Sequence, residues 1–158
     1  MIIEKAGEKD LPEILELQKL AFRSQAEIYN DFSIPPMIQT LGEIKRDFLK
    51  QIYLKAVING KIIGSVRGFL ENGTCYVGRL IVRPDLQNKG IGTKLMHEIE
   101  TVFNQAQRLE IFTGFKDEKN LYLYNKLGYK QFKSELVNES LTMVFLEKIS
   151  QEYKIVKD

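Results

Sequence analysis

The residues best suited to chemistry lie in one short loop, Gln87-Asn88-Lys89-Gly90-Ile91-Gly92-Thr93, between an apolar run and a pattern with helical spacing. Glycine at positions 90 and 92 lets the backbone turn sharply and approach a ligand without a Cβ in the way. The first turn of a following helix has unpaired N–H groups and the positive end of the helix dipole, which suits a phosphate. Lys89 and Thr93 add a cation and a hydroxyl beside those amides. Either the loop is only a tight strand-to-helix connection, or its amides bind an anion.

The spacing of this loop differs from the two familiar phosphate-binding fingerprints. The position that would need the third glycine of GxGxxG holds Leu95, and no Gly-Lys pair is followed by Ser or Thr. Short glycine patterns are weak signals when they stand alone. A nucleotide-binding α/β domain is therefore a disfavoured interpretation, which a measured preference for ATP or NAD would revive.

Composition limits the classes of protein that can carry this loop. The sequence has 158 residues, 44% hydrophobic and 28% charged, which is ordinary for one soluble globular domain. A net charge of +2 gives no field that favours nucleic acid or an anionic membrane, and no apolar run is long enough to span a bilayer. One cysteine, one histidine and an N-terminus without a signal-peptide core favour a cytoplasmic protein with no metal site.

Strand and helix patterns predict a mixed sheet in an α/β or α+β domain. Strands are expected at residues 1–6, 52–58, 61–70, 75–82, 109–115, 129–137 and 140–148. Helices are expected at residues 10–22 and 40–50, directly after the loop, and at 118–128. Asp10 and Glu13 have the spacing of a capping box, and Asn59-Gly60 is a hairpin signal. Residues 24–37 are expected to be irregular, with Pro35-Pro36 stopping any helix there. We expect one domain at residues 1–150 and a solvated tail at 151–158.

Other residue types that can react have simpler interpretations. His97 lies on the polar face of its helix and is expected at the surface, whereas Cys75 begins a strand and is expected to pack. Four aromatic residues are expected in the core: Phe69, Phe112, Phe115 and Phe132.

Two motifs and the order of elements resemble one known family. Gln87-x-x-Gly90-x-Gly92, after "GRLIV" and "RPD", resembles the acyl-CoA-binding motif of the GNAT family of N-acetyltransferases. The segment "EKNLYLYNKLGYKQF" resembles a later helix of that family, with Leu123-Tyr124 and Gly128-Tyr129 in the matching places. The opening "IIEKAGEKDLPEILEL" looks like the family's first strand and helix, so the resemblance covers nearly the whole chain.

This resemblance implies a fold and a cosubstrate. The fold is a single-domain acyl-CoA N-acyltransferase-like fold, whose central, twisted and mostly antiparallel sheet is flanked by about four helices. The cosubstrate is acetyl-CoA, with no metal. Main-chain groups of Leu80, Ile81 and Val82 would contact its pantetheine arm, and the amides from Gln87 to Thr93 would hold its pyrophosphate. Asn120 is a further candidate for the pantetheine arm, with a plain helix surface as the alternative.

The resemblance also assigns Tyr124 as the general acid near the departing sulfur, with a core aromatic residue as the alternative. An amine of ordinary pKa, roughly 10.4, must lose a proton before it attacks a thioester. Residues 75–82 contain no Asp or Glu, and Arg79 stands in that region, so a base on this strand is in doubt. Glu27, Tyr29 and Asp31 are candidates on the acceptor side, each with ordinary loop surface as its alternative.

The leading function is transfer of an acetyl group from acetyl-CoA to a primary amine of a small molecule or peptide. The alternative is a catalytically silent acyl-CoA-binding module that senses the cofactor or regulates a partner. Tyr124 favours the enzyme, while the missing strand carboxylate keeps the silent module open. Dimers are common in the family, so a homodimer is compatible with the resemblance, and no residue selects the acceptor.

Overall fold

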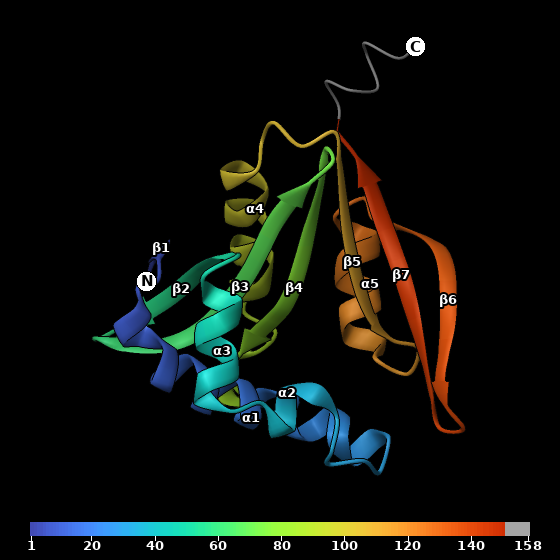
Figure 1. Ribbon diagram of the computed structural model, residues 1–158, viewed down its shortest axis with the longest axis horizontal. Coiled ribbons are helices and arrows are strands. Elements are labelled where there is room, and N and C mark those ends of the chain that lie inside the picture. Colours follow the sequence, from blue (N-terminus) through green and yellow to red (C-terminus); the bar gives the residue numbers. More distant parts are fainter. Residues whose placement is uncertain (151–158) are drawn as a thin grey trace. The chain divides into compact units, whose positions relative to one another are not determined.

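The computed structural model describes residues 1–150, which form seven strands, five α-helices and two short 3-10 helices (Figure 1). The strands are β1 (Ile2–Lys5), β2 (Ile52–Ile58), β3 (Lys61–Glu71), β4 (Thr74–Val82), β5 (Arg108–Gly114), β6 (Lys130–Asn138) and β7 (Leu141–Ile149). The helices are η1 (Glu8–Asp10), α1 (Leu11–Ile28), α2 (Pro35–Ile38), α3 (Leu41–Phe48), η2 (Pro84–Leu86), α4 (Ile91–Val102) and α5 (Glu118–Lys126). The predicted tail, residues 151–158, lies outside the described residues.

The strands pair in the order β1-β2-β3-β4-β5-β7-β6. The pairs β1–β2, β2–β3, β5–β7 and β6–β7 are antiparallel, whereas β4 and β5 run parallel. The parallel register extends from Thr74 opposite Arg108 to Tyr76 opposite Glu110. The prediction of a mixed, mostly antiparallel sheet is therefore confirmed.

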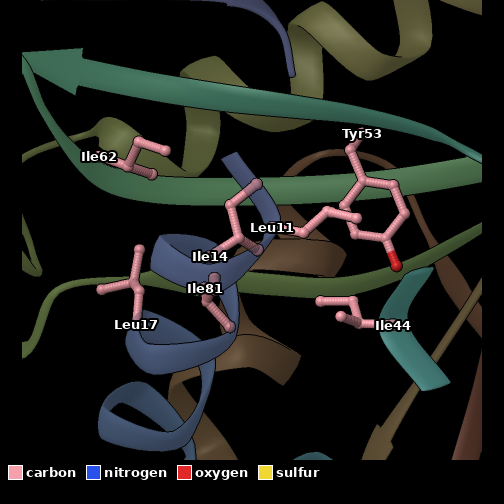
Figure 2. Close-up of a cluster of buried hydrophobic side chains, with 7 residues drawn as sticks. All are labelled: Leu11, Ile14, Leu17, Ile44, Tyr53, Ile62 and Ile81. Atoms are coloured by element: carbon pink, nitrogen blue, oxygen red, sulfur yellow. The ribbon is translucent and has the colours of Figure 1, made fainter. Parts of the chain in front are cut away.

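The chain divides into two compact units, and β4 contributes residues to both. The first unit consists of residues 1–69 and 79–102. Its hydrophobic core lies between α1, α3 and strands β2 to β4 (Figure 2). The buried side chains of this core are Leu11, Ile14, Leu17, Ile44, Tyr53, Ile62 and Ile81. The spacing of the α1 residues, three apart, places them on one helix face, so burial of that face holds α1 against the strands.

Helix α4 packs closely on β3 because Gly64 has no side chain. A Cβ on Gly64 would lie 3.0 Å from Cδ1 of Leu95 and 3.1 Å from the carbonyl oxygen of Ile81. Both Leu95 and Ile91 approach the strand at this point. This close contact anchors the first turns of α4, and with them the loop that precedes the helix.

The second unit contains residues 70–78 and the described residues from 103 onward. Here β5 lies between the start of β4 and β7, and β6 forms the outer strand. Helix α5 begins after Asp117, whose side chain accepts from the Asn120 N–H, and ends before Gly128 at φ +99°. The β6–β7 turn is held by Asn138 Oδ1, which accepts from the N–H groups of Ser140 and Leu141.

Turn signals in the sequence are confirmed where glycine follows asparagine. At the β2–β3 turn, Asn59 and Gly60 have φ values of 50° and 77°. At the β3–β4 turn, Asn72 and Gly73 have φ values of 51° and 81°. Positive φ at both central residues is the backbone geometry that a two-residue hairpin favours.

Three local predictions were wrong. Asp10 and Glu13 form no capping box: Asp10 accepts from Gly7 N–H and Lys55 Nζ, and Glu13 accepts from Ile62 N–H at 2.7 Å. Asp10 thus bonds back to the start of η1 and across to β2, while Glu13 bonds β3. Helix α1 continues to Ile28, so residues 24–28 are helical. Pro35 and Pro36 do not stop a helix: they form the first turn of α2, where proline is tolerated because the first N–H groups of a helix have no partner within it.

The aromatic core is smaller than predicted. The side chains of Phe112, Phe115 and Phe132 are 52%, 42% and 40% exposed. Phe132 lies on β6, whose outer position in the sheet leaves all its residues exposed. His97 is exposed and Cys75 fully buried, as predicted. No helix in residues 1–150 is long and apolar enough to cross a membrane.

Candidate functional site

The loop before α4 presents a row of backbone amides. Asn88 and Gly90 have φ values of 63° and 83°, and α4 begins at Ile91 with Lys94 N–H donating to the Gly90 carbonyl at 3.1 Å. Within residues 1–150, no acceptor is found for the backbone N–H groups of residues 88–93. A Cβ on Gly90 would meet nothing within 4 Å. The loop therefore has both the donors and the space that an anion needs at a helix N-terminus.

Polar contacts fix the chain where it enters the loop. The Gln87 side chain donates from Nε2 to the Val82 carbonyl at 3.2 Å, and Arg83 N–H donates to the Ile63 carbonyl at 2.8 Å. Arg83 Nε and Nη2 also bond both oxygens of Asp85, which holds the pKa of that carboxyl below its usual value. Gln87 thus shapes the loop through its side chain, and its own amide contacts the Pro84 carbonyl at 3.4 Å.

The strand residues predicted to contact the pantetheine arm directly precede this loop. Ile81 is buried in the core by its side chain, while Leu80 and Val82 are half-buried. All three lie beyond the residues of β4 that form the parallel register with β5. The Gln87 side chain engages the Val82 carbonyl, so that group is not free for the contact predicted for Val82.

Tyr124 and Asn120 belong to α5 in the second unit. Tyr124 is 2% exposed, and its burial, together with the negative charge of Asp117, raises the pKa of the phenol well above its usual value. Asn120 donates from Nδ2 to Asp117 Oδ2 at 2.7 Å, and Thr113 Oγ1 donates to the same oxygen at 2.9 Å. Burial raises the pKa of Asp117 despite these hydrogen bonds. Asp117 therefore caps α5, and the Asn120 side chain is held against this cap.

The three acceptor-side candidates have different surroundings from those predicted. Glu27 lies in α1, where its Oε1 pairs with Nε of exposed Arg23 at 3.4 Å. Tyr29 is 5% exposed, so it is not loop surface. Asp31 accepts from the Ser33 hydroxyl and from its N–H at 2.9 Å, and these bonds lower the pKa of Asp31. Glu27 lies in the last turn of α1, and Asn30 N–H donates to its carbonyl at 3.2 Å, so all three candidates lie at the C-terminal end of this helix.

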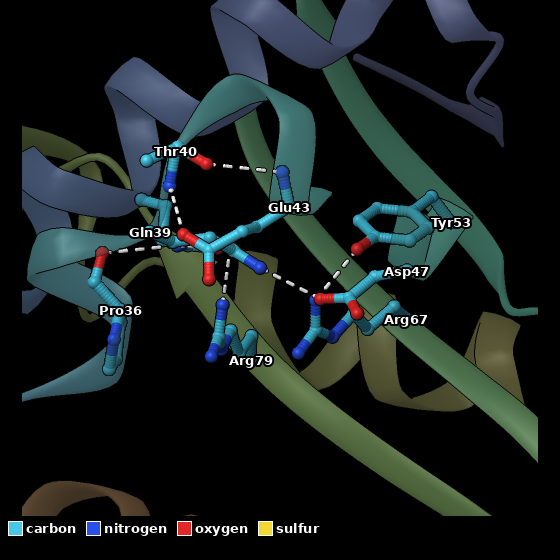
Figure 3. A network of polar contacts seen from close by, with 9 residues as sticks. Pro36, Gln39, Thr40, Glu43, Asp47, Tyr53, Arg67 and Arg79 are labelled. Carbon is cyan, nitrogen blue, oxygen red and sulfur yellow. Dashed lines mark hydrogen bonds and ion pairs between the residues drawn. The ribbon is translucent and has the colours of Figure 1, made fainter. Parts of the chain in front are cut away.

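A polar cluster that the sequence did not predict lies in the first unit (Figure 3). Six residues from α1, α3, β2, β3, β4 and the segment between α2 and α3 form it: Gln18, Gln39, Asp47, Tyr53, Arg67 and Arg79. We call this set the arginine cluster.

Gln39 is the centre of the arginine cluster. Its Oε1 accepts from Arg79 Nη1 and from Gln18 Nε2 at 3.0 Å, and its Nε2 donates to Asp47 Oδ2 at 2.7 Å. Arg67 Nη1 donates to Asp47 Oδ2 at 3.2 Å and to the Tyr53 hydroxyl at 2.7 Å. Arg67 thus bonds the carboxylate and Arg79 the amide, and Gln39 links the two through its bond to Asp47.

A sequence signal for this cluster exists. Arg67 interrupts a stretch of β3 in which residues 62–66 are all buried. An arginine inside a strand buried on both faces needs a polar partner nearby, because buried charges are paired or hydrogen-bonded. The identity of that partner could not be read from the sequence, since Asp47 is twenty residues away in α3.

The fold and the sequence place the chain in one family. The sequence profile described as the acetyltransferase (GNAT) family matches residues 11–129, most of the chain. The protein therefore belongs to the acetyltransferase (GNAT) family.

Individual relatives are distant. The chain is similar to the protein named uncharacterized N-acetyltransferase ycf52 of Pyropia yezoensis, at 22% identity, covering 80% of this chain and 84% of that protein. It is also 26% identical to UPF0157 protein YqkA of Bacillus subtilis (strain 168) over 75% of this chain. The chain spans about a third (34%) of the length of YqkA.

A solved structure has the same fold. The PaiA N-acetyltransferase from Thermoplasma acidophilum, solved in complex with coenzyme A, superposes with a TM-score of 0.71. The two chains are 18% identical, and the superposition covers 94% of this chain and 99% of that one. The protein therefore has the GNAT fold that the motifs suggested.

Proposed function

We propose that the protein transfers an acetyl group from acetyl-CoA to a primary amine of a small molecule or peptide. The observation that carries this proposal is the row of backbone amides at residues 88–93, without protein acceptors among the described residues and placed at the N-terminus of α4. Family membership supports the reaction, and a protein of the same fold binds coenzyme A. Asn88 to Thr93 would hold the pyrophosphate by N–H donation, supported by the helix dipole.

Acetyl-CoA supplies an activated thioester, from which an amine takes the acetyl group as the C–N bond forms and the C–S bond breaks. The amine loses a proton and CoA departs as a thiol. In this proposal the Tyr124 phenol donates a hydrogen bond to the developing negative charge on sulfur. Its raised pKa supports this role, because the phenol stays neutral, and therefore a donor, throughout the physiological pH range.

No carboxylate of β4 is available to take the proton from the amine, because residues 74–82 contain none. We assign this proton to solvent. The single cysteine, Cys75, is fully buried, which fits a reducing compartment, and we place the enzyme in the cytoplasm.

The test is release of CoA thiol from acetyl-CoA with a panel of polyamines, amino acids, aminoglycosides and N-terminal peptides. Acceptor-dependent release, confirmed by the mass of the product, is expected. In parallel, Tyr124→Phe should lower kcat about a hundredfold and leave acetyl-CoA binding intact, since it removes one proton donor. Tyr122→Phe is the matched control, because Tyr122 lies on the same helix and is 71% exposed.

Two results would contradict these assignments. Equal rates for wild type and Tyr124→Phe from pH 6 to 10 (about the range below the ordinary phenol pKa) would remove Tyr124 from the mechanism. Stabilisation of the fold by acetyl-CoA without release of thiol from any amine would favour the silent acyl-CoA-binding module.

A further inference from the structure

Arg79 has a backbone conformation that is rare for a long side chain. It lies within β4 but has a φ of 45°, in the left-handed region. A non-glycine residue in this region is strained, and such residues concentrate at ligand-binding sites where the surroundings impose the conformation. The backbone conformation of Arg79 therefore suggests that its side chain has a specific role.

The two guanidinium groups of the arginine cluster have more donors than the protein uses. Each guanidinium carries five N–H donors. Arg79 uses Nη1 alone, toward the neutral Gln39 amide, and Arg67 uses Nη1 alone, toward Asp47 and Tyr53. Arg67 is also within 5.6 Å of the centre of the Tyr53 ring. In the described chain, no carboxylate oxygen lies within 4.0 Å of the Arg79 guanidinium.

A second arginine of the same protein shows what a structurally satisfied guanidinium looks like. Arg108 bonds Glu110 at 2.8 Å through Nη2 and Glu147 at 3.0 Å through Nε. Although burial alone would lower the pKa of Arg108, these two carboxylates raise it. For Arg79, burial and the neighbouring positive charge of Arg67 lower the pKa to about 10. The more distant negative charges of Asp47 and Glu43 offset only part of this lowering. Arg79 stays charged at neutral pH, yet it lacks the direct carboxylate contact that Arg108 makes twice.

The place of Arg79 in the chain connects it with the proposed reaction. Residues 80–82 are the strand segment proposed to contact the pantetheine arm, and Arg79 is the residue next to that segment, on the side away from the loop. The side chains of both arginines are partly exposed, that of Arg67 at 12%, so neither is fully shielded from solvent. Figure 3 shows the two guanidinium groups side by side.

We propose that Arg79, with Arg67 beside it, binds a carboxylate of the acceptor, so that the acceptor is an amine that also carries a carboxylate. This inference rests on the proposed acetyl transfer for its functional meaning. A carboxylate can accept two parallel N–H bonds from one guanidinium, which gives both energy and orientation. It would supply the direct carboxylate contact that Arg79 lacks and hold the amine end of the acceptor at a fixed distance from Arg79.

The first experiment compares acids with their neutral amides as acceptors. Glycine, β-alanine and 4-aminobutyrate would each be tested against the corresponding primary amide, with release of CoA thiol as the readout. Because the pKa of the amine differs between an acid and its amide, the deciding quantity is the acid-to-amide ratio of kcat/KM in each protein variant. We expect Arg79→Gln to lower this ratio about ten- to a hundredfold, the effect of losing hydrogen bonds to a charged group.

Matched variants separate this effect from general damage. Arg46→Gln removes an exposed positive charge from α3 and should keep the wild-type ratio. Arg79→Lys keeps the charge but loses the paired donors, and should give an intermediate ratio. Stabilisation of each variant by acetyl-CoA, measured by thermal unfolding, shows that the fold and the loop are intact. An acid-to-amide ratio that is the same in wild type and Arg79→Gln would overturn the proposal.

A second experiment tests the anion site without turnover. NMR signals of the arginine Nε–H groups would be followed while the protein is titrated with 4-aminobutyrate or with its amide. Shifts of the Arg79 signal with the acid alone support the carboxylate site. This NMR result does not depend on acetyl transfer. If no amine released thiol and acetyl-CoA did not stabilise the protein, the proposed function would be refuted, but a shift of the Arg79 signal would still support the carboxylate site. No shift with any of the three acids would overturn the inference, and tighter binding of 2-aminoethyl phosphate would overturn the choice of carboxylate.

Discussion

The loop at residues 87–93 and the arginine cluster offer hydrogen-bond donors in different ways. The loop offers backbone N–H groups, positioned by the positive φ of Asn88 and Gly90 and by the start of α4. The arginine cluster offers side-chain donors, positioned by six residues from separate elements. Backbone donors depend little on side-chain identity, so the loop suits a constant ligand such as a pyrophosphate. Side-chain donors change with single substitutions, which suits the choice of acceptor.

The largest effect should come from a negative charge in the loop. Gly90→Glu places a carboxylate beside the amides, and like charges brought together cost several kcal/mol, so acetyl-CoA affinity should fall about a thousandfold. Steric exclusion by the protein contributes nothing, because a Cβ at Gly90 meets no atom within 4 Å. Isothermal titration with acetyl-CoA measures the loss.

Gly60→Glu is the matched control for this prediction. Gly60 has a φ of 77°, close to the 83° of Gly90, and a Cβ there also meets nothing within 4 Å. Both variants should therefore lose about 1–2 kcal/mol of stability from the left-handed backbone, and only Gly90→Glu should lose acetyl-CoA. If folded Gly90→Glu bound acetyl-CoA with unchanged affinity, the loop would not be the pyrophosphate site. The contrast between backbone donors in the loop and side-chain donors in the arginine cluster would then fail.

A smaller effect, on stability, should follow from breaking the arginine cluster. Gln39→Leu removes one donor and one acceptor that serve Asp47, Gln18 and Arg79. Leaving such partly buried groups without partners should lower the free energy of unfolding by about 2–3 kcal/mol. Urea denaturation measures this change, and acetyl-CoA affinity per folded molecule should stay the same.

Gln131→Leu provides the comparison for Gln39→Leu, since Gln131 lies exposed on β6. Its effect should stay within about 0.5 kcal/mol. If Gln39→Leu instead lowered acetyl-CoA affinity as strongly as it lowered stability, the loop and the arginine cluster would not be independent sites.

This difference between backbone and side chains also explains what the sequence could predict. Glycine spacing, Asn-Gly turns and a strand-to-helix change are local signals, and they predicted the loop, the hairpins and the mixed sheet. The arginine cluster joins residues up to forty positions apart, as between Gln39 and Arg79. Arg67 within a buried strand is the one local signal, and it does not identify the distant partners, so the cluster was missed.

The errors follow the same rule. Asp10 and Glu13 had a local capping pattern, but partners on β2 and β3 competed successfully for both carboxylates. Phe132 had a hydrophobic side chain in a strand pattern, but the outer position of β6 depends on the strand order, which its own sequence does not contain. Short-range sequence patterns therefore predict helices, strands and turns well, but they predict the tertiary contacts between these elements poorly.

The smallest expected effect concerns Lys89, the one side-chain cation within the loop. Lys89 is exposed, so its charge interacts with an anion through water and is screened by salt. Lys89→Gln should weaken acetyl-CoA binding only about two- to fivefold at low ionic strength, and the difference should vanish near 1 M salt, where the screening length is about 3 Å. Lys61→Gln, at the exposed β2–β3 turn, controls for the loss of one charge.

Arg79→Gln should keep its effect on acid acceptors at moderate salt, because the guanidinium is half-buried and bonds its ligand directly. A large, salt-resistant effect at Lys89 would mean that the loop, like the arginine cluster, depends on a side chain in direct contact with its ligand.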